Sequence, residues 1–386
     1  MARIVDPAFP ERLRVAIADS GASYRALAAR TFYSRGYLHD LATGRKTPTQ
    51  AVARRIDEAL GLRGVLAALV SVNDFDAGEL ARRVAASDVS DETLERLEAA
   101  VDDLAVAYTL TAPVDLLPQV LEHLRYVRRL VDARSTLAQR RRLIVAGGWL
   151  ALLAATVHID LRHRTHGATH LATARQMADQ AEHHEIVAWT IETLAWDKLT
   201  SGDFSAAVRL AQQAQRVAPI GSSAFIQATA QEGRALARMG RQAEMRDALD
   251  RTDRLVSTLA PPDRPEHHYR YDPAKSHAYV GTTLAWAGDP AAETYARAVV
   301  TELETSPIAR PRRTASARLD LGLALLSAGK PDEAGAVTIA AVQTGRVVAS
   351  NWWRVAEVLT GVERLGIREG ADLREVCEAH RPGAVK

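Results

Sequence analysis

The sequence predicts an all-α protein, in which an N-terminal domain of four to five short helices precedes an α-solenoid of helical pairs. Two patterns lead to this prediction. Short capped amphipathic segments follow one another in the first 65 residues, and glycine-marked helix breaks recur at intervals of 38, 48 and 41 residues later in the chain. The length of 386 residues also exceeds the ~250 at which a single core stops growing, so we expect two or three domains.

Cysteine usage and hydropathy predict a cytoplasmic protein that makes no membrane contact. The chain has one cysteine, Cys377, which excludes an internal disulfide and cysteine-based zinc sites. No charged-then-apolar leader pattern opens the sequence. The most apolar run, residues 143–159, is shorter than the ~20 residues that a membrane-spanning helix needs. We therefore interpret this run as a buried helix.

Charge is distributed unevenly, although the net charge is only +2. Residues 1–70 contain 11 Lys or Arg against 6 Asp or Glu, whereas the remainder contains 38 against 41. A basic N-terminal domain on a slightly acidic body favours a nucleic-acid contact confined to that domain. Arginine far outnumbers lysine, of which there are five, and this usage is typical of a high-G+C genome such as those of actinobacteria.

Four short helical segments are predicted between residues 9 and 61. Ser23 and Ser34 can cap the second and third, because their hydroxyls accept backbone N–H bonds. Gly44 can end the third and Pro48 can open the fourth. The tight turn between the second and third segments predicts a helix-turn-helix. The apolar residues that mark the expected inner faces are Phe9, Leu13, Val15, Ile17, Leu27, Ala28, Leu38, Leu41, Val52, Ile56 and Leu60.

The stretch from Tyr24 to Pro48 resembles the lambda-repressor-like family of Cro or XRE type. The positions that carry the resemblance are Leu27, Ala28, Ser34, Leu38, Leu41, Gly44 and Pro48. It implies a helix-turn-helix domain over residues 1–70 whose partner is double-stranded DNA. Phe32 replaces the usual turn glycine, and Ala42 replaces a common acidic residue. We expect Phe32 to staple the turn to the core.

The docking geometry of such a domain indicates which side chains read DNA. A recognition helix enters the major groove N-terminus first, so the base-reading candidates are Ser34, Arg35, Gly36, His39 and Asp40. Arg35 can donate twice to a guanine, and Asp40 can accept from a cytosine or steer Arg35. The candidates for phosphate contacts are Ser23, Tyr24, Tyr37, Arg45 and Lys46. The alternative is that these side chains only solvate the surface of a helix-turn-helix that binds protein.

Residues 71–112 are predicted to be a helical linker or a dimerisation segment. A turn-like cluster at residues 73–76 is followed by a helix that begins after Ser90, with Leu94, Leu97 and Val101 on one face. The sequence leaves three roles open for this segment: a linker, a docking helix or part of a dimer contact.

Residues 113–386 carry the repeated pattern. Helices are expected to break at Gly202, Gly240, Gly288 and Gly329, and seven residues before these breaks stand Ala195, Gly233, Gly281 and Gly322. Alanines recur after two of the breaks, as Ala207, Ala214, Ala334 and Ala341. This pattern resembles the tetratricopeptide repeat, although the intervals depart from that family's ~34-residue period. The resemblance implies antiparallel helical pairs that stack into a curved superhelix.

Such a superhelix has a concave groove lined by the first helix of each pair. On this alignment the groove residues are Trp189, Glu192, Trp196, Gln227, Arg234, Arg238, Lys275, Thr282 and Trp286. Aromatic and cationic side chains together suit a negatively charged small molecule, peptide or protein effector. The alternative is that the tryptophans pack between repeats and the arginines pair with acids.

No catalytic or metal-binding constellation is evident in the sequence. Six histidines lie between residues 158 and 184, but their spacing does not bring three ligands to one helix face. His267 and His268 lie beside several prolines and are expected in an exposed loop. We therefore expect neither enzymatic activity, nor a cofactor, nor a metal.

Taken together, these patterns predict a sequence-specific DNA-binding transcriptional regulator. Dimerisation is expected because a two-fold operator doubles the contacts of one small domain. Two alternatives remain: a helical-repeat adaptor protein without specific DNA binding, and an enzyme whose site lies hidden in the helical body.

Overall fold

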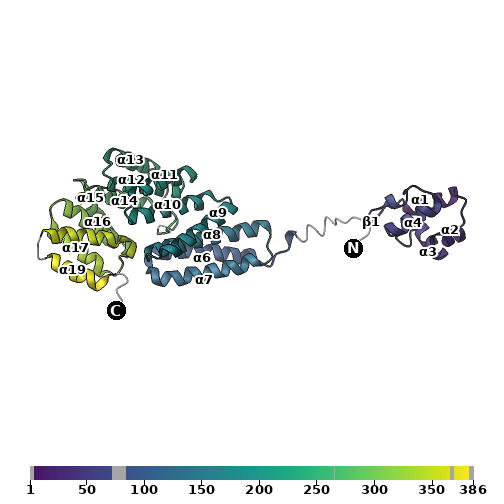
Figure 1. The fold of residues 1–386 in the computed structure, drawn as a ribbon, viewed down its shortest axis with the longest axis horizontal. Coiled ribbons are helices and arrows are strands. Elements are labelled where there is room, and N and C mark those ends of the chain that lie inside the picture. The colour runs from purple at the N-terminus through teal and green to yellow at the C-terminus, as the bar shows by residue number, and fades with distance from the viewer. Residues whose placement is uncertain (1–3, 72–83, 265, 366–368, 382–386) are drawn as a thin grey trace. The chain divides into compact units, whose positions relative to one another are not determined.

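A computed structural model describes residues 4–71, 84–264, 266–365 and 369–381 (Figure 1). The chain divides into two compact units, Met1–Ala86 and Ser87–Lys386. Helices dominate both, as the sequence predicted, and the only strands among the described residues form one short antiparallel pair. In that pair Ile4 lies opposite Ser71 and Val5 opposite Val70.

The first unit is a small helical domain with one core. Its elements are β1 (Ile4–Val5), α1 (Phe9–Asp19), α2 (Tyr24–Thr31), α3 (Arg35–Ala42), α4 (Gln50–Leu60), the 3-10 turn η1 (Ala67–Leu69) and β2 (Val70–Ser71). Phe9, Leu13, Leu27, Leu38 and Ile56 are fully buried in its core. The other expected core residues lie in or against this core, whereas Val15 on α1 is 46% exposed.

A buried carboxylate closes the C-terminal end of this domain. Asp57 on α4 is 2% exposed and accepts the backbone N–H groups of Leu66 at 2.9 Å and Ala67 at 2.8 Å. Two charge-assisted hydrogen bonds offset the desolvation of this carboxylate. The segment after α4 is thereby held against the helices, and residues 66–70 complete the core.

The second unit is a stack of helices (Figure 1). Its elements are α6 (Asp91–Leu110), α7 (Pro113–Asp132), α8 (Leu137–Asp160), α9 (Arg164–Gln180), α10 (His184–Thr200), α11 (Phe204–Val217), α12 (Ser223–Arg238), α13 (Gln242–Val256), η2 (Pro273–Lys275), α14 (Ser276–Ala287), α15 (Ala292–Thr305), α16 (Pro311–Ser327), α17 (Pro331–Gln343), η3 (Ala349–Asn351), α18 (Trp352–Arg364) and α19 (Glu369–His380).

From α8 onward the helices pack in consecutive pairs, and the first helices α10, α12, α14, α16 and α18 also pack against one another. This arrangement is the predicted solenoid. The breaks at Gly202, Gly240, Gly288 and Gly329 adopt left-handed backbone conformations, with φ of 85°, 69°, 66° and 72°. A residue with a side chain is strained there, so glycine sets the end of each first helix.

Small residues allow the paired helices to approach closely. A Cβ added to Gly322 on α16 would lie 2.6 Å from Thr338 Oγ1 on α17. Ala195, Ala207 and Ala334 are fully buried at the corresponding helix contacts. The spacing of small residues in the sequence therefore has the expected steric cause.

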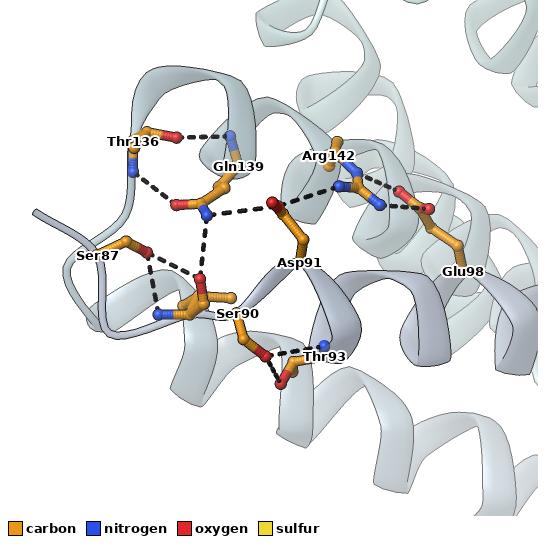
Figure 2. Close-up of polar contacts among 9 residues, drawn as sticks. Ser87, Ser90, Asp91, Thr93, Glu98, Thr136, Gln139 and Arg142 are labelled. Atoms are coloured by element: carbon orange, nitrogen blue, oxygen red, sulfur yellow. Dashed lines mark hydrogen bonds and ion pairs between the residues drawn. The ribbon is translucent and has the colours of Figure 1, made fainter. Parts of the chain in front are cut away.

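Residues 91–110 belong to the second unit rather than to a separate linker. In Figure 2 the Gln139 amide on α8 donates to the Val89 carbonyl at 3.0 Å, and Arg142 donates to Glu98 at 2.8 and 2.9 Å. Ser90 caps α6 by accepting the Thr93 N–H at 3.1 Å. The apolar face of α6 packs into the same core as α8, so the expected boundary at residue 112 differs from the one in the structure. Residues 72–83 of the expected segment lie outside the described residues.

Within the described part of the chain, α8 is the one helix long and apolar enough to cross a membrane. However, 83% of its most apolar window is buried inside the protein. It is the central helix of the second unit's first core, which accounts for its composition.

Candidate DNA-binding surface and repeat-domain cavity

Helices α2 and α3 form a tight helix-turn-helix. The Ser23 hydroxyl accepts the Ala26 N–H at 3.2 Å, and the Ser34 hydroxyl accepts the Tyr37 N–H at 3.1 Å. Each bond satisfies a backbone donor that the first turn of a helix leaves free. The buried face of α3 carries Leu38 and Leu41, so its other face is turned to the solvent.

The exposed face of α3 begins with the residues expected to read bases. Ser34, Arg35, Gly36 and His39 are all exposed. Among the described residues Arg35 takes part in no ion pair, so its guanidinium donors are available to a partner. No atom lies within 4 Å of a Cβ placed on Gly36, which leaves the backbone open to close approach.

The C-terminal end of α3 holds a small charged cluster. Lys46 Nζ lies 3.3 Å from Asp40 Oδ2 and 5.6 Å from the centre of the Tyr37 ring. The N–H of Arg45 donates to the Asp40 carbonyl at 2.8 Å, and both basic side chains are exposed. Asp40 therefore pairs with Lys46, and of its two expected roles the steering of Arg35 is not observed. A surface ion pair contributes little, so Lys46 can exchange Asp40 for a phosphate.

The two expected sets of DNA contacts are neighbours on the surface. The rings of Tyr24 at the start of α2 and His39 on α3 lie 6.0 Å apart. Tyr24 is half-buried and its neighbour Ser23 is exposed. The N-terminus of α2 thus borders the exposed face of α3, as phosphate and base contacts require.

Phe32 does not staple the turn to the core. It is 82% exposed, and its left-handed φ of 59° turns its side chain away from the buried leucines. The Arg55 guanidinium lies 5.5 Å from the centre of its ring. An L-residue in place of the usual glycine here costs about 1 kcal/mol.

Comparison with known proteins gives a family match within the first unit. Residues 9–70 match the helix-turn-helix domain family. None of the curated proteins matches the chain. The matched range ends where η1 and β2 complete the first core, and it includes both helices of the exposed surface. The family match supports a DNA-binding regulator of the helix-turn-helix type.

The second unit contains a cavity of about 230 Å³. Its walls come mainly from the first helices of successive pairs, with further residues from α6, α15, η2, η3 and the segment before α14. The expected groove residues that line it are Trp189, Glu192, Trp196, Gln227, Arg234, Lys275 and Thr282. These seven side chains, which the repeat pattern assigned to one groove, therefore line one cavity.

Arg238 and Trp286 do not line this cavity. Arg238 donates to Glu357 at 3.1 and 2.9 Å, and its guanidinium lies 5.0 Å from the centre of the Trp353 ring. Trp286 is buried and its Nε1 donates to Asp320 Oδ1 at 2.9 Å. Both residues fit the alternative expectation of packing and ion pairing, because neighbouring helices cover them.

The chain between α13 and α14 folds inward, contrary to the exposed loop expected around His267 and His268. His267 is 5% exposed, and the His268 ring lies 4.2 Å from the Tyr108 ring on α6. The His268 N–H donates to the Ala105 carbonyl at 3.2 Å. This segment therefore contacts α6, and His268 forms part of the cavity wall.

Buried ion pairs brace the cavity walls. Arg312 on α16 bonds to Asp160 at the end of α8, which also accepts from Tyr108 Oη at 2.7 Å and from Ser350 Oγ at 2.7 Å. Arg354 Nη1 lies 3.1 Å from Asp320 Oδ1. These pairings could not be predicted from the sequence, because the partners lie on helices far apart in the chain.

Two cavity groups have pKa values displaced toward neutrality. Burial raises the pKa of the Glu192 carboxyl to about 7, although Arg234 and a hydrogen bond from Gln227 at 3.3 Å oppose the shift. Burial also lowers the pKa of the Lys275 ammonium to about 8. The charged forms of both groups are destabilised because protein atoms replace the water around them.

The histidines near the α8–α9 turn lie close together. The His158 ring stacks 5.1 Å from His166 and 5.2 Å from His170, and its Nδ1 lies 3.3 Å from that of His163. Across the residues that the structure describes, no group of three or more His, Cys, Asp or Glu side chains is arranged to hold a metal ion.

Proposed function

We propose that this chain is a sequence-specific DNA-binding transcriptional regulator of XRE type, from an actinobacterial source, that acts in the cytoplasm on the nucleoid. The observation that carries the proposal is the exposed guanidinium of Arg35 at the start of α3, beside the open backbone of Gly36. Lys46 and Arg45 flank the same helix. A recognition helix needs these groups: a guanidinium that donates to a base edge, and cations that contact phosphates.

The regulator binds a two-fold operator as a dimer, because one small domain buries too little DNA surface for tight binding. The tetratricopeptide-like second unit serves for dimerisation and for sensing an effector. Its cavity, which is lined by aromatic and charged side chains, supports the sensing role. The chain has no catalytic role in this proposal and needs no cofactor.

A helical-repeat adaptor is the second candidate, and the exposure of Phe32 favours it. A large aromatic side chain on the surface, with Arg55 beside its ring, is typical of a protein contact. In this case the first unit binds protein rather than DNA.

Selection of bound fragments from random and genomic DNA tests the proposal. The winning sequence is titrated with wild-type protein and with Arg35→Ala at two salt concentrations. Arg54→Ala is the matched control, since Arg54 is an exposed arginine on α4 rather than on α3. We expect an inverted repeat that the wild type and the control prefer and Arg35→Ala does not. If no sequence is enriched, and binding vanishes at modest salt, the adaptor becomes the better reading.

A further inference from the structure

The cavity contains a buried arginine without a counter-ion. Arg234 on α12 is 5% exposed, and its Nε and Nη2 have no hydrogen-bond partner among the described residues. Its guanidinium lies 4.6 Å from the centre of the Tyr279 ring and 5.7 Å from that of Trp196. Ring faces stabilise a cation only partly, so this arginine retains unsatisfied donors in a low-dielectric site.

The other arginines of the cavity have acidic partners. Arg312 pairs with Asp160, Arg354 with Asp320, and Arg313 with Glu266 at 2.9 Å. No ion pair of the described residues includes Arg234. Arg234 influences the carboxyl of Glu192, and burial brings the pKa of that carboxyl to about 7. Glu192 is therefore only partly ionised at neutral pH and is a weak counter-ion for Arg234.

The guanidinium of Arg234 lines the cavity, and its Nε and Nη2 are themselves covered by protein atoms. The N–H bonds of Nε and Nη2 run parallel on one side of a guanidinium, and they match the two oxygens of a carboxylate. The same edge is used elsewhere in this protein, where Arg142 Nε and Nη2 donate to the two oxygens of Glu98 (Figure 2). The bidentate geometry is thus one that this chain forms with its own acids.

The rest of the cavity suits an apolar group attached to such a carboxylate. Trp189, Trp196, Tyr279, Val299 and Leu303 contribute ring and aliphatic surface to its walls. Its volume of about 230 Å³ is below the range typical of drug-sized ligands.

We propose that the second unit binds a small organic carboxylate with an aromatic or aliphatic body, and that the guanidinium of Arg234, which lines the cavity, is the counter-ion of its carboxylate. This ligand class refines the sensing role proposed above and rests on that role for its regulatory meaning. The binding itself does not depend on DNA.

Thermal shift and calorimetric titration of the full chain, without DNA, test this proposal. The probes are phenylacetate, indole-3-acetate and octanoate at millimolar concentration, each beside its neutral amide. We expect at least one acid to bind and raise the melting temperature, while its amide binds about 10- to 100-fold more weakly. If none of the acids binds the folded chain, or the amides bind as well as the acids, the proposal is wrong.

Variants separate a ligand anchor from a structural cation. Arg234→Met should lose the acid response yet keep or raise the melting temperature of the free chain, because it removes an uncompensated buried charge. Arg238→Gln, on the same helix but outside the cavity, should retain the response. Glu192→Gln should tighten acid binding by removing a competing carboxylate. A marked loss of stability in both Arg234→Met and Glu192→Gln would instead show that the two residues neutralise each other, and would overturn the proposal.

DNA binding is then measured with and without the bound acid. Acid binding in a chain that selects no DNA sequence would refute the regulator and leave the ligand site intact. Specific DNA binding by a chain that binds no acid would refute the ligand site and leave the regulator intact. The two proposals can therefore fail independently.

Discussion

Removal of the Asp160 carboxylate should destabilise the second unit by about 4 kcal/mol. Asp160 is 1% exposed and bonds to Arg312 on α16, Tyr108 on α6 and Ser350 in η3. In Asp160→Ala the Arg312 guanidinium stays buried without its counter-ion, which costs about 3–5 kcal/mol in comparable cases. The lost hydroxyl contacts overlap with this term and do not add in full.

Urea unfolding followed by tryptophan fluorescence measures this loss. All six tryptophans lie between residues 149 and 353, so the signal reports the second unit alone. The double variant Asp160→Ala with Arg312→Met is the control, because it removes both charges. We expect the double variant to recover most of the stability lost in Asp160→Ala. A loss below about 1 kcal/mol in Asp160→Ala would refute a buried ion pair that braces α8 against α16.

Four further predictions follow from single sites. Arg35→Ala should cost about 1–3 kcal/mol on the selected operator and little on random DNA, as measured by equilibrium titration. Lys46→Ala should weaken binding to both DNAs about equally and reduce the slope of log K against log salt by about 1; an unchanged slope would contradict a phosphate contact. Burial and the neighbouring histidines lower the pKa of His158 to about 4 from 6.5, so the unfolded chain binds its proton first. Stability should therefore be full above pH about 6.5 and fall by on the order of 2 kcal/mol at pH about 5, seen as a lower urea midpoint; a constant midpoint would argue against the burial of this ring. Gly322→Ala should destabilise the second unit by about 1–3 kcal/mol, because its Cβ would meet Thr338 Oγ1 at 2.6 Å, and an unchanged melting temperature would mean that α16 and α17 separate easily.

The helix-turn-helix could be recognised from the sequence because local rules decide it. Ser23 and Ser34 cap helices through bonds to residues three positions away, and Gly44 ends a helix through its own backbone conformation. The exposure of Arg35 and the burial of Leu38 follow from the helical period alone. Phe32 was the exception. Its apolar character predicted burial, but its backbone is left-handed and its side chain is exposed.

The helical pairs were also visible in the sequence, since a close contact needs small residues at set distances from each turn. Gly233, Gly281 and Gly322 mark those contacts, and the turn glycines set the helix ends. By contrast, the sequence did not show to which unit residues 91–110 belong. An amphipathic helix buries one face on any suitable partner, and only the contacts with α8 assign α6 to the second unit.

The sequence alone determined the all-α class, the helix-turn-helix and most of the side chains around one concave face, because periodicity and capping act over a few residues. Tertiary structure decided which charges are paired and whether that face is open. Arg238 found Glu357, 119 residues away, and Arg312 found Asp160, 152 residues away, whereas Arg234 found no such partner. These outcomes depend on long-range packing of α6, α16, α18 and residues 257–264 and 266–272, for which no local pattern exists. Desolvation acts at that same level, and so the cavity and the unpaired state of Arg234 became apparent only in three dimensions.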